Sequence, residues 1–194
     1  MEKSMIRHYR LAKELSQLFD LESNIDAVLA VSMYKLNQFM DSERSSIFLF
    51  DPLKQQLTSF SSQDLEKKEI RIPKSSGVSG WVFEHRMPAI VNDTDSDSRF
   101  YSGVDDMTGF RTRNMICTPL IDYNEHCSGT LQSLNKKSGD FTNDDLELLD
   151  LTARLVAVAI NNSRRYSEIQ TTNMVHKKVI KQIINNIGNI SEKK

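Results

Sequence analysis

Residues 100–114, with the sequence FYSGVDDMTGFRTRN, bring aromatic, acidic, hydroxyl and glycine residues together. Tyr101, Asp105, Thr108 and Thr112 are spaced four, three and four residues apart, which predicts that their side chains share one face of a helix. Such a face offers a carboxylate and three hydroxyls for hydrogen bonds. The segment is either a surface helix that covers a core with its apolar side or a lid over a polar ligand, and spacing alone does not separate the two.

A second candidate binding element is the start of a helix in the segment SSGVSGWVFEHRM. Gly77 and Gly80 bracket this start, and the helix should end before Pro88. The unpaired amides around Val78 and Ser79, together with the positive end of the helix dipole, suit one phosphate charge. An ordinary glycine-rich helix start has the same pattern, so both interpretations stay open here.

Other patterns of reactive or metal-binding residues are incomplete. Asp93, Asp95 and Asp97 match the first, third and fifth positions of an EF-hand loop. However, Ser98 stands where the loop requires glycine, and Val104 stands where it requires a bidentate glutamate. The histidines share no metal-ligand spacing with each other or with the cysteines: His8, His85, His126 and His176. With no nucleophile elbow or P-loop either, we expect no metal site and no catalytic site.

Length and charge limit the class of protein. A chain of 194 residues with 39% hydrophobic content can form one domain with helical extensions. The 25 basic and 26 acidic residues give a net charge of −1, which offers no electrostatic basis for binding nucleic acid or an anionic membrane. The N-terminus lacks a signal-peptide core and no run is long enough to span a membrane, so we expect a cytoplasmic protein with Cys117 and Cys127 as reduced core thiols.

The elements that must position the candidate residues alternate between helices and strands. Amphipathic helices are predicted over residues 4–19 and 23–41, the second capped at Ser23. The sequence predicts strands at 45–50, 57–61, 69–72, 89–91, 114–121 and 128–134, the last two joined as a hairpin. A final helix begins at the capping signal of Thr142 and Asp145 and extends to about residue 187. The expected class is therefore α+β, with a mostly antiparallel sheet flanked by helices and long helices at both ends.

The last helix carries a heptad-spaced seam: Tyr166, Ile169, Asn173, His176, Ile180, Ile183, Ile187 and Ile190. Asparagine at a core position of such a seam favours a parallel, in-register pair of helices. This pattern predicts a homodimer, and the alternative is a solvent-exposed helix.

Four segments together resemble a GAF domain: RSSIFLFD, EIRIPKSSGVSGWVFE, FYSGVDDMTGFRTRN and CTPLID…GTLQSLNK. The resemblance covers residues 24–163 and implies three parts: a connecting helix (1–22), the GAF domain (23–163) and a coiled-coil helix (164–194). Within the superfamily it is to the GAF domains that regulate cyclic-nucleotide phosphodiesterases and certain adenylyl cyclases. Those domains carry a signature that matches Asn135, Lys136, Phe141 and Asp145, although Leu146 replaces its final glutamate. In the family the lysine and aspartate form a salt bridge that braces the lid.

The resemblance also implies a set of ligand contacts. Ser46 matches a serine near the purine, and Phe60 matches the aromatic ring that packs on the base. Val78 and Ser79, with the backbone near Tyr101, match the amides that hold the cyclic phosphate. The lid residues Asp105, Thr108 and Thr112 match positions that reach the base and ribose, and Gln132 stands where a glutamate approaches the sugar. Val104, Met107 and Phe110 are then expected to pack the lid against the body of the domain.

One departure from the cGMP-binding relatives affects ligand preference. They place an aspartate after the aromatic residue, where this chain has Ser61. Loss of that charged acceptor should remove on the order of 1.5–3 kcal/mol of guanine preference, so we favour cAMP slightly over cGMP.

The expected function is a non-catalytic regulatory module that binds cAMP or cGMP and passes the signal through its terminal helices to an unknown output domain or partner protein. GAF domains elsewhere bind other small ligands or none, so a module that acts mainly in dimerisation is the alternative. Enzyme activity is expected only from a domain outside this chain.

Overall fold

The computed structural model describes residues 2–21, 24–60 and 69–191, and side chains for residues 4–20, 24–60 and 69–180. The chain divides into two compact units, Met1–Ala159 and Ile160–Lys194. The predicted residues Ser23 and Ser61 lie outside the described residues, as do the side chains of Ile183, Ile187 and Ile190.

The first unit is built on an antiparallel sheet whose six described strands follow the order β3-β2-β1-β6-β5-β4. The strands are β1 (Ser42–Asp51), β2 (Gln56–Phe60), β3 (Arg71–Pro73), β4 (Ala89–Val91), β5 (Met115–Ile121) and β6 (Cys127–Lys136). Nine successive residues of β6 are buried, because the strand lies in the middle of the sheet and both faces are covered. Each predicted strand overlaps a described strand and the hairpin prediction is confirmed, but β1 begins at Ser42, where it pairs with Lys136, and β3 covers Arg71–Pro73 instead of residues 69–72.

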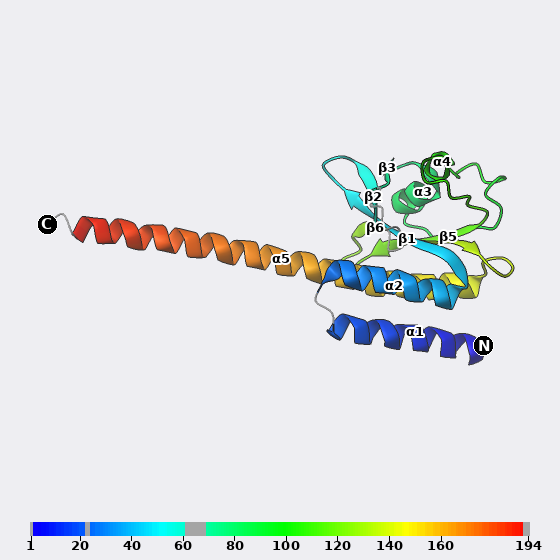
Figure 1. Cartoon of the computed structure of the whole chain (residues 1–194), viewed down its shortest axis with the longest axis horizontal. Helices are drawn as coiled ribbons and strands as arrows, with labels where there is room; N and C mark the ends of the chain where they lie inside the picture. The colour runs from blue at the N-terminus through cyan, green and yellow to red at the C-terminus, as the bar shows by residue number, and fades with distance from the viewer. Residues whose placement is uncertain (1, 22–23, 61–68, 192–194) are drawn as a thin grey trace. The chain divides into compact units, whose positions relative to one another are not determined.

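Helices cover both faces of this sheet (Figure 1). Their bounds are α1 (Glu2–Leu21), α2 (Ile25–Met40), α3 (Gly77–His85), α4 (Gly103–Thr108) and α5 (Asn143–Ser191). One face carries α2 and the part of α5 that belongs to the first unit, and the other face carries α3 and α4. Helix α1 packs on the outer side of α2 with Leu11 and Leu15 fully buried, as its amphipathic pattern predicts.

Local capping fixes where two of these helices begin. The Asn24 side chain accepts a hydrogen bond from the Asp26 backbone N–H at 2.9 Å, so the cap of α2 is Asn24, one residue after the predicted position. Before α5, the Thr142 N–H donates to Asp145 Oδ2 at 2.9 Å and the Asp145 N–H donates to Thr142 Oγ1 at 3.3 Å. This reciprocal pair is the predicted capping box.

The helix predicted across Tyr101 and Thr112 is shorter than expected. Helix α4 covers only Gly103–Thr108 and ends at Gly109, which has a φ of 69° and donates its N–H to Asp105 O. A residue in this left-handed conformation ends a helix, so Tyr101 and Thr112 flank α4 instead of sharing its face.

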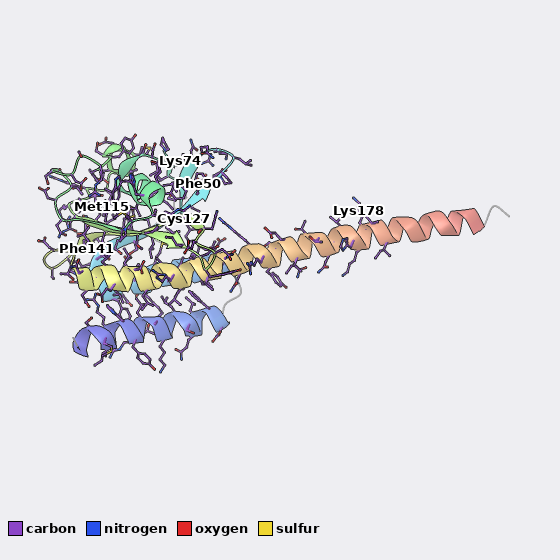
Figure 2. All side chains as sticks on the ribbon, turned by 180° about the vertical axis from the view of Figure 1, so that it is seen from behind. Phe50, Lys74, Met115, Cys127, Phe141 and Lys178 are labelled. Carbon is purple, nitrogen blue, oxygen red and sulfur yellow. The ribbon has the colours of Figure 1, made fainter. Side chains whose placement is uncertain are left out.

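In the second unit, α5 continues as a helix with all described side chains from residue 164 to residue 180 exposed, Lys178 among them (Figure 2). The exposed seam includes Tyr166, Ile169 and Ile180, which are 64%, 59% and 56% exposed in the single chain. A helix with exposed isoleucines at heptad spacing is consistent with a coiled coil, and dimerisation stays a prediction. No described helix combines the length and the apolar character needed to cross a bilayer.

Two glycines allow α3 to start where it does. Gly77 has a φ of 71°, a conformation that other residues rarely adopt. At Gly80 an added Cβ would lie 2.6 Å from the carbonyl carbon of Ser75 and 2.8 Å from Lys74 O. Both contacts are with backbone atoms, so the chain before α3 would have to move.

We therefore expect Gly80→Ala to lower the free energy of unfolding by about 1–3 kcal/mol through overpacking. The exposed residue Glu84 lies on the same helix, and Glu84→Ala is the matched control. Thermal or urea unfolding of both variants checks this. If the Gly80→Ala protein is as stable as the control, the backbone before α3 moves to accommodate the added methyl group at little cost in free energy.

Candidate functional site

A cavity of about 610 Å³, including adjoining solvent, lies between the sheet, the first turn of α3 and the α4 segment. Strands β1 and β6 form its floor through Ser46 and Gln132, which lie opposite each other in the antiparallel register. Most of the predicted ligand contacts line this cavity: Ser46, Val78, Ser79, Tyr101, Asp105, Thr108, Thr112 and Gln132. The tertiary structure thus brings together residues from four separate segments.

The floor and the α3 start are joined by one buried hydrogen bond. Ser79 Oγ donates to Gln132 Oε1 at 2.7 Å, and both residues are nearly inaccessible to solvent. This bond holds the first turn of α3 above the sheet, so the amides of Val78 and Ser79 are fixed relative to the cavity. The Gln132 side chain therefore positions α3 in addition to lining the cavity.

The polar groups of the lid are hydrogen-bonded to one another. The Asp105 carboxylate accepts from the Thr112 backbone N–H at 2.6 Å and from Thr112 Oγ1 at 2.8 Å. Thr108 Oγ1 donates to Val104 O at 2.9 Å. The Asp105–Thr112 bonds stabilise the turn after α4, and the Thr108 bond lies within the helix.

The apolar side of the lid is only partly as predicted. Val104 packs on a cluster of Phe48, Leu57 and Ile72, and Phe110 packs on a second cluster that includes Val78. Met107 is 55% exposed, so the prediction that it packs against the body is wrong. A helix of six residues makes fewer than two turns and presents few positions to the core.

Two predicted base contacts are not among the lining residues. Phe60 ends β2 opposite Ile47 and is half-buried outside the cavity lining, and Ser61 lies outside the described residues.

The sequence did not predict that Arg44, on β1, lines the cavity. Its position two residues before Ser46 is a signal that could have found it, since alternate strand residues point to the same face.

The signature residues form a buried ion pair. Lys136 Nζ lies 2.7 Å from Asp145 Oδ2, and Asp145 is 1% exposed. Phe141 is buried beside them, with the lysine nitrogen 5.5 Å from the centre of its ring. This pair links the end of β6 to the first turn of α5.

Asn135 extends the signature toward the lid. Its side chain accepts from the Arg113 backbone N–H at 2.7 Å and donates to Arg111 O at 2.8 Å. These two bonds hold the chain on either side of Thr112, which in turn binds Asp105 in α4. A continuous set of hydrogen bonds and covalent neighbours therefore connects the signature to the lid.

A second cation reaches Asp145 from α1. Arg7 Nη2 lies 2.8 Å from Asp145 Oδ1 and 3.2 Å from Asp144 Oδ2. Burial alone would raise the pKa of Asp145, but hydrogen bonds from Lys136 and Arg7 outweigh burial and hold that pKa below its ordinary value. Sequence reasoning missed Arg7 because no local pattern relates it to a residue so far along the chain.

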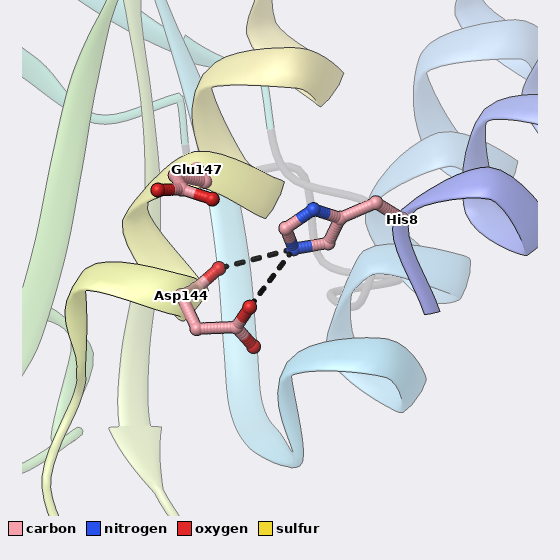
Figure 3. A group of neighbouring side chains, drawn as sticks. All are labelled: His8, Asp144 and Glu147. Atoms are coloured by element: carbon pink, nitrogen blue, oxygen red, sulfur yellow. Dashed lines mark hydrogen bonds and ion pairs between the residues drawn. The ribbon is translucent and has the colours of Figure 1, made fainter. Parts of the chain in front are cut away.

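A cluster of possible metal ligands lies where α1 meets α5 (Figure 3). Donor atoms of His8, Asp144 and Glu147 lie within 4.8 Å of one another. His8 Nε2 is 3.2 Å from Asp144 O and 3.4 Å from Asp144 Oδ1, and Ser4 and Arg7 also bond to the Asp144 carboxylate. Because protein groups already engage the His8 and Asp144 atoms and Arg7 repels cations, we interpret the cluster as a contact that docks α1.

Both cysteines are free and buried, as predicted. Burial raises the pKa of the Cys117 thiol to about 12, and burial also raises the pKa of Cys127. A thiol with a raised pKa is a poor nucleophile, so both residues act as core side chains.

The model of the family described as "GAF domain" matches residues 24–160. The chain belongs to the GAF domain family. The matched range runs from the cap of α2 into α5 and contains the whole cavity and the signature.

Relatives of this GAF domain include cyclic-nucleotide phosphodiesterases. The dual 3',5'-cyclic-AMP and -GMP phosphodiesterase 11A of Takifugu rubripes is 26% identical over 174 residues, which cover 81% of this chain and 18% of that protein. The probable 3',5'-cyclic phosphodiesterase pde-5 of Caenorhabditis elegans is 27% identical over 159 residues, which cover 76% of this chain and 22% of that protein. The chain therefore spans about a fifth of the length of these relatives.

Solved structures share the fold at low identity. The GAF domain of a phosphoenolpyruvate-protein phosphotransferase from Coxiella burnetii has a TM-score of 0.73 at 16% identity, covering 84% of this chain and 98% of that one. The free methionine-R-sulfoxide reductase of Neisseria meningitidis has a TM-score of 0.71 at 18% identity, covering 86% and 95%. The α+β fold with an antiparallel sheet is thus that of the family, and the same fold occurs in a methionine-sulfoxide reductase.

We expect Asp145→Asn to lower the free energy of unfolding by about 3 kcal/mol at pH 7, because it leaves two cations without their buried partner. The folded-state pKa is depressed, so the stabilisation is fully present above the unfolded-state pKa of about 3.9. It is lost as the pH falls below that value through the folded-state pKa. Urea unfolding at pH 7 and at pH 3 measures both effects.

The exposed residue Asp140 supplies the matched control, since Asp140→Asn removes a carboxylate in the loop before α5 and should change stability by less than about 0.5 kcal/mol. Equal effects of the two substitutions at pH 7 would contradict the role assigned to Asp145.

Proposed function

We propose that this GAF domain is a non-catalytic regulatory module that binds a cyclic nucleotide in the cavity beneath α4. The observation that carries the proposal is the cavity itself, in which the first turn of α3, two hydroxyl-bearing lid residues and the sheet floor converge. The relatedness to proteins named as cyclic-nucleotide phosphodiesterases supports this ligand class.

In this proposal the cyclic phosphate binds to the amides of Val78 and Ser79 and to the backbone near Tyr101. A helix N-terminus attracts an anion because its first N–H groups have no partner within the helix. Tyr101 lies beside Gly77, where an added Cβ would lie 3.4 Å from Tyr101 Cβ. The phosphate would therefore lie between α3 and the chain that leads into α4.

The base would lie toward Ser46, with Gln132 near the ribose. The resemblance implies Ser61 at the position where cGMP-binding relatives have an aspartate. Serine donates and accepts hydrogen bonds, whereas the aspartate of cGMP-binding relatives only accepts when ionised. We therefore propose cAMP as the slightly favoured ligand over cGMP.

Binding would replace the hydrogen bonds that the lid makes with itself. Asp105 and Thr112 would exchange part of their mutual bonding for contacts with the base and ribose. Because Asn135 holds the chain on both sides of Thr112, and Lys136 pairs with Asp145 in α5, ordering of the lid can bias the terminal helix. An output domain or a partner protein would respond to that change. The free thiols Cys117 and Cys127 support a cytoplasmic location.

One observation favours the alternative, a GAF domain that binds another ligand or none and acts mainly in dimerisation. Both carboxylate oxygens of Asp105 already have partners within the lid. A lid whose polar groups satisfy one another needs no ligand to be stable.

Calorimetric titration of the ligand-free chain with cAMP and cGMP decides between the two proposals. We expect saturable binding of both nucleotides, with cAMP slightly tighter, and no consumption of either. Asp105→Ala combined with Thr108→Ala should abolish binding and leave the oligomeric state unchanged. Asp106 is exposed on the same helix, and Asp106→Ala should bind as the unmodified chain does.

Absence of heat with both nucleotides at millimolar concentration would favour the dimerisation module. Turnover of either nucleotide by the isolated chain would instead contradict the non-catalytic assignment.

The proposed homodimer makes a separate prediction for α5. Ile180 lies on the heptad seam and Val175 lies off it, and they are 56% and 54% exposed in the single chain. Ile180→Glu should weaken the dimer at least tenfold because it places a charge at a core position, whereas Val175→Glu should have little effect. Sedimentation equilibrium measures both. Equal effects would show that the seam is not the interface.

A further inference from the structure

Gln132 offers the cavity a polar atom to which no described residue is bonded. Its Oε1 accepts a hydrogen bond from Ser79 Oγ, and no bond joins its Nε2 to a described residue. The side chain is only 7% exposed, yet Nε2 is not among the fully buried side-chain atoms that lack a partner in the described structure. The accessible surface of this nitrogen therefore lies in the cavity that Gln132 lines.

The hydrogen bonds behind Gln132 fix which end of its amide meets the cavity. Cys117 Sγ lies 3.9 Å from Ser79 Oγ and donates to it, because the raised pKa of this buried thiol keeps it protonated. The Ser79 hydroxyl then donates its own proton to Gln132 Oε1 at 2.7 Å. A reversed amide would direct a second donor at Ser79 Oγ and leave the hydroxyl proton without this acceptor. The nitrogen, which can only donate, is therefore the end of the amide that remains for a ligand.

The hydroxyl groups around Gln132 are either already bonded or able to take both roles. Ser46 lies opposite Gln132 in the pairing of β1 with β6, and its hydroxyl can donate or accept. On the lid, the Thr112 hydroxyl donates to Asp105, and the Thr108 hydroxyl donates within α4. Of the two residues that form the cavity floor, Gln132 is therefore the one whose hydrogen-bonding role is fixed.

Gln132 lies beside the amides to which we assign the phosphate. Its Oε1 is bonded to a side chain in the first turn of α3, and its Nε2 is attached to the same carbon as Oε1. An amide N–H attracts an oxygen or ring nitrogen that carries no proton. The glutamate that related GAF domains have at the matched position would instead accept from a donor and repel an anion. The two side chains differ only in one group, an N–H donor in place of a carboxylate oxygen.

We propose that Gln132 is a specificity-determining residue whose Nε2 donates a hydrogen bond to the bound nucleotide, so that the cavity selects ligands with an acceptor at this point. The inference rests on the proposed function and adds the direction of this hydrogen bond. The acceptor is an oxygen of the phosphate or of the ribose, which are the parts of the nucleotide proposed to lie near α3 and Gln132.

Gln132→Glu tests the direction of the bond, because it keeps an acceptor for Ser79 and replaces only the N–H group. In calorimetric titration we expect cAMP binding at about pH 8 to be at least about tenfold weaker, because the ionised carboxylate cannot donate. Burial raises the pKa of a carboxyl, and a protonated carboxyl can donate, so the affinity should recover as the pH falls to about 5.5. The unmodified chain, titrated over the same range, is the control for the charged residues that line the cavity, Arg44 and Asp105.

Gln132→Met removes the donor without adding a charge. It should weaken cAMP binding about three- to tenfold, the effect of one hydrogen bond. Ser79→Ala removes the bond to Oε1 but keeps the nitrogen, so its effect on binding should be smaller. The analogue 2'-deoxy-cAMP identifies the acceptor, and either result supports the donor role. If Gln132→Met weakens its binding as it weakens that of cAMP, the acceptor is a phosphate oxygen, and if the effect disappears, the acceptor is the ribose 2'-oxygen.

Three results would overturn the role of Gln132. Binding of cAMP by Gln132→Glu that is undiminished at about pH 8 and weakens on acidification would show that the ligand supplies a donor. Equal losses in Ser79→Ala and Gln132→Met would assign Gln132 to the positioning of α3 alone, and thermal unfolding of each variant verifies that it is folded. Unchanged affinity in Gln132→Met would reject the role while leaving the proposed function intact, whereas no nucleotide binding by the unmodified chain would reject both.

Discussion

The buried carboxylate of Asp145 is the constraint on which the arrangement of this domain depends. A charge that is 1% exposed is tolerated only where cations and donors surround it, and here Lys136, Arg7 and Thr142 do so. These partners come from β6, from α1 and from the turn before α5. One side chain therefore fixes the end of the central strand, the docking of the first helix and the start of the last.

The lid depends on the same region through neighbouring residues. Asn135 precedes Lys136 and binds the backbone on both sides of Thr112, while Thr112 binds Asp105 in α4. Helix α4 itself contains no buried residue among those described, so its place is set by these polar contacts and by Val104. An element with so little buried surface can move at small cost, whereas the anchor at Asn135 is fully buried. This contrast suits a lid that responds to a ligand.

The cavity combines fixed and adaptable groups. The bond from Ser79 to Gln132 fixes the first turn of α3 on the sheet, while the hydroxyls of Thr108 and Thr112 bond to neighbouring groups within the lid. For the proposed nucleotide to bind, its contacts must therefore outweigh the internal bonds that it displaces. The amides at the start of α3 have no partner within the helix and are the proposed contacts of its phosphate. The GAF fold alone does not decide the ligand, since similar folds occur in proteins with different activities.

Local patterns in the sequence determined the strands, the capping box of α5, the glycine-dependent start of α3 and the spacing of the signature, because each depends on residues near one another in the chain. Other features were decided only by tertiary structure. Gly109 ended α4 before Thr112, Arg7 reached Asp145 from the opposite end of the domain, and Arg44 reached the cavity through the pairing of β1 with β6. These contacts arise from packing between distant segments. The spacing of residues along one sequence indicates local structure but does not indicate which distant side chains will be in contact.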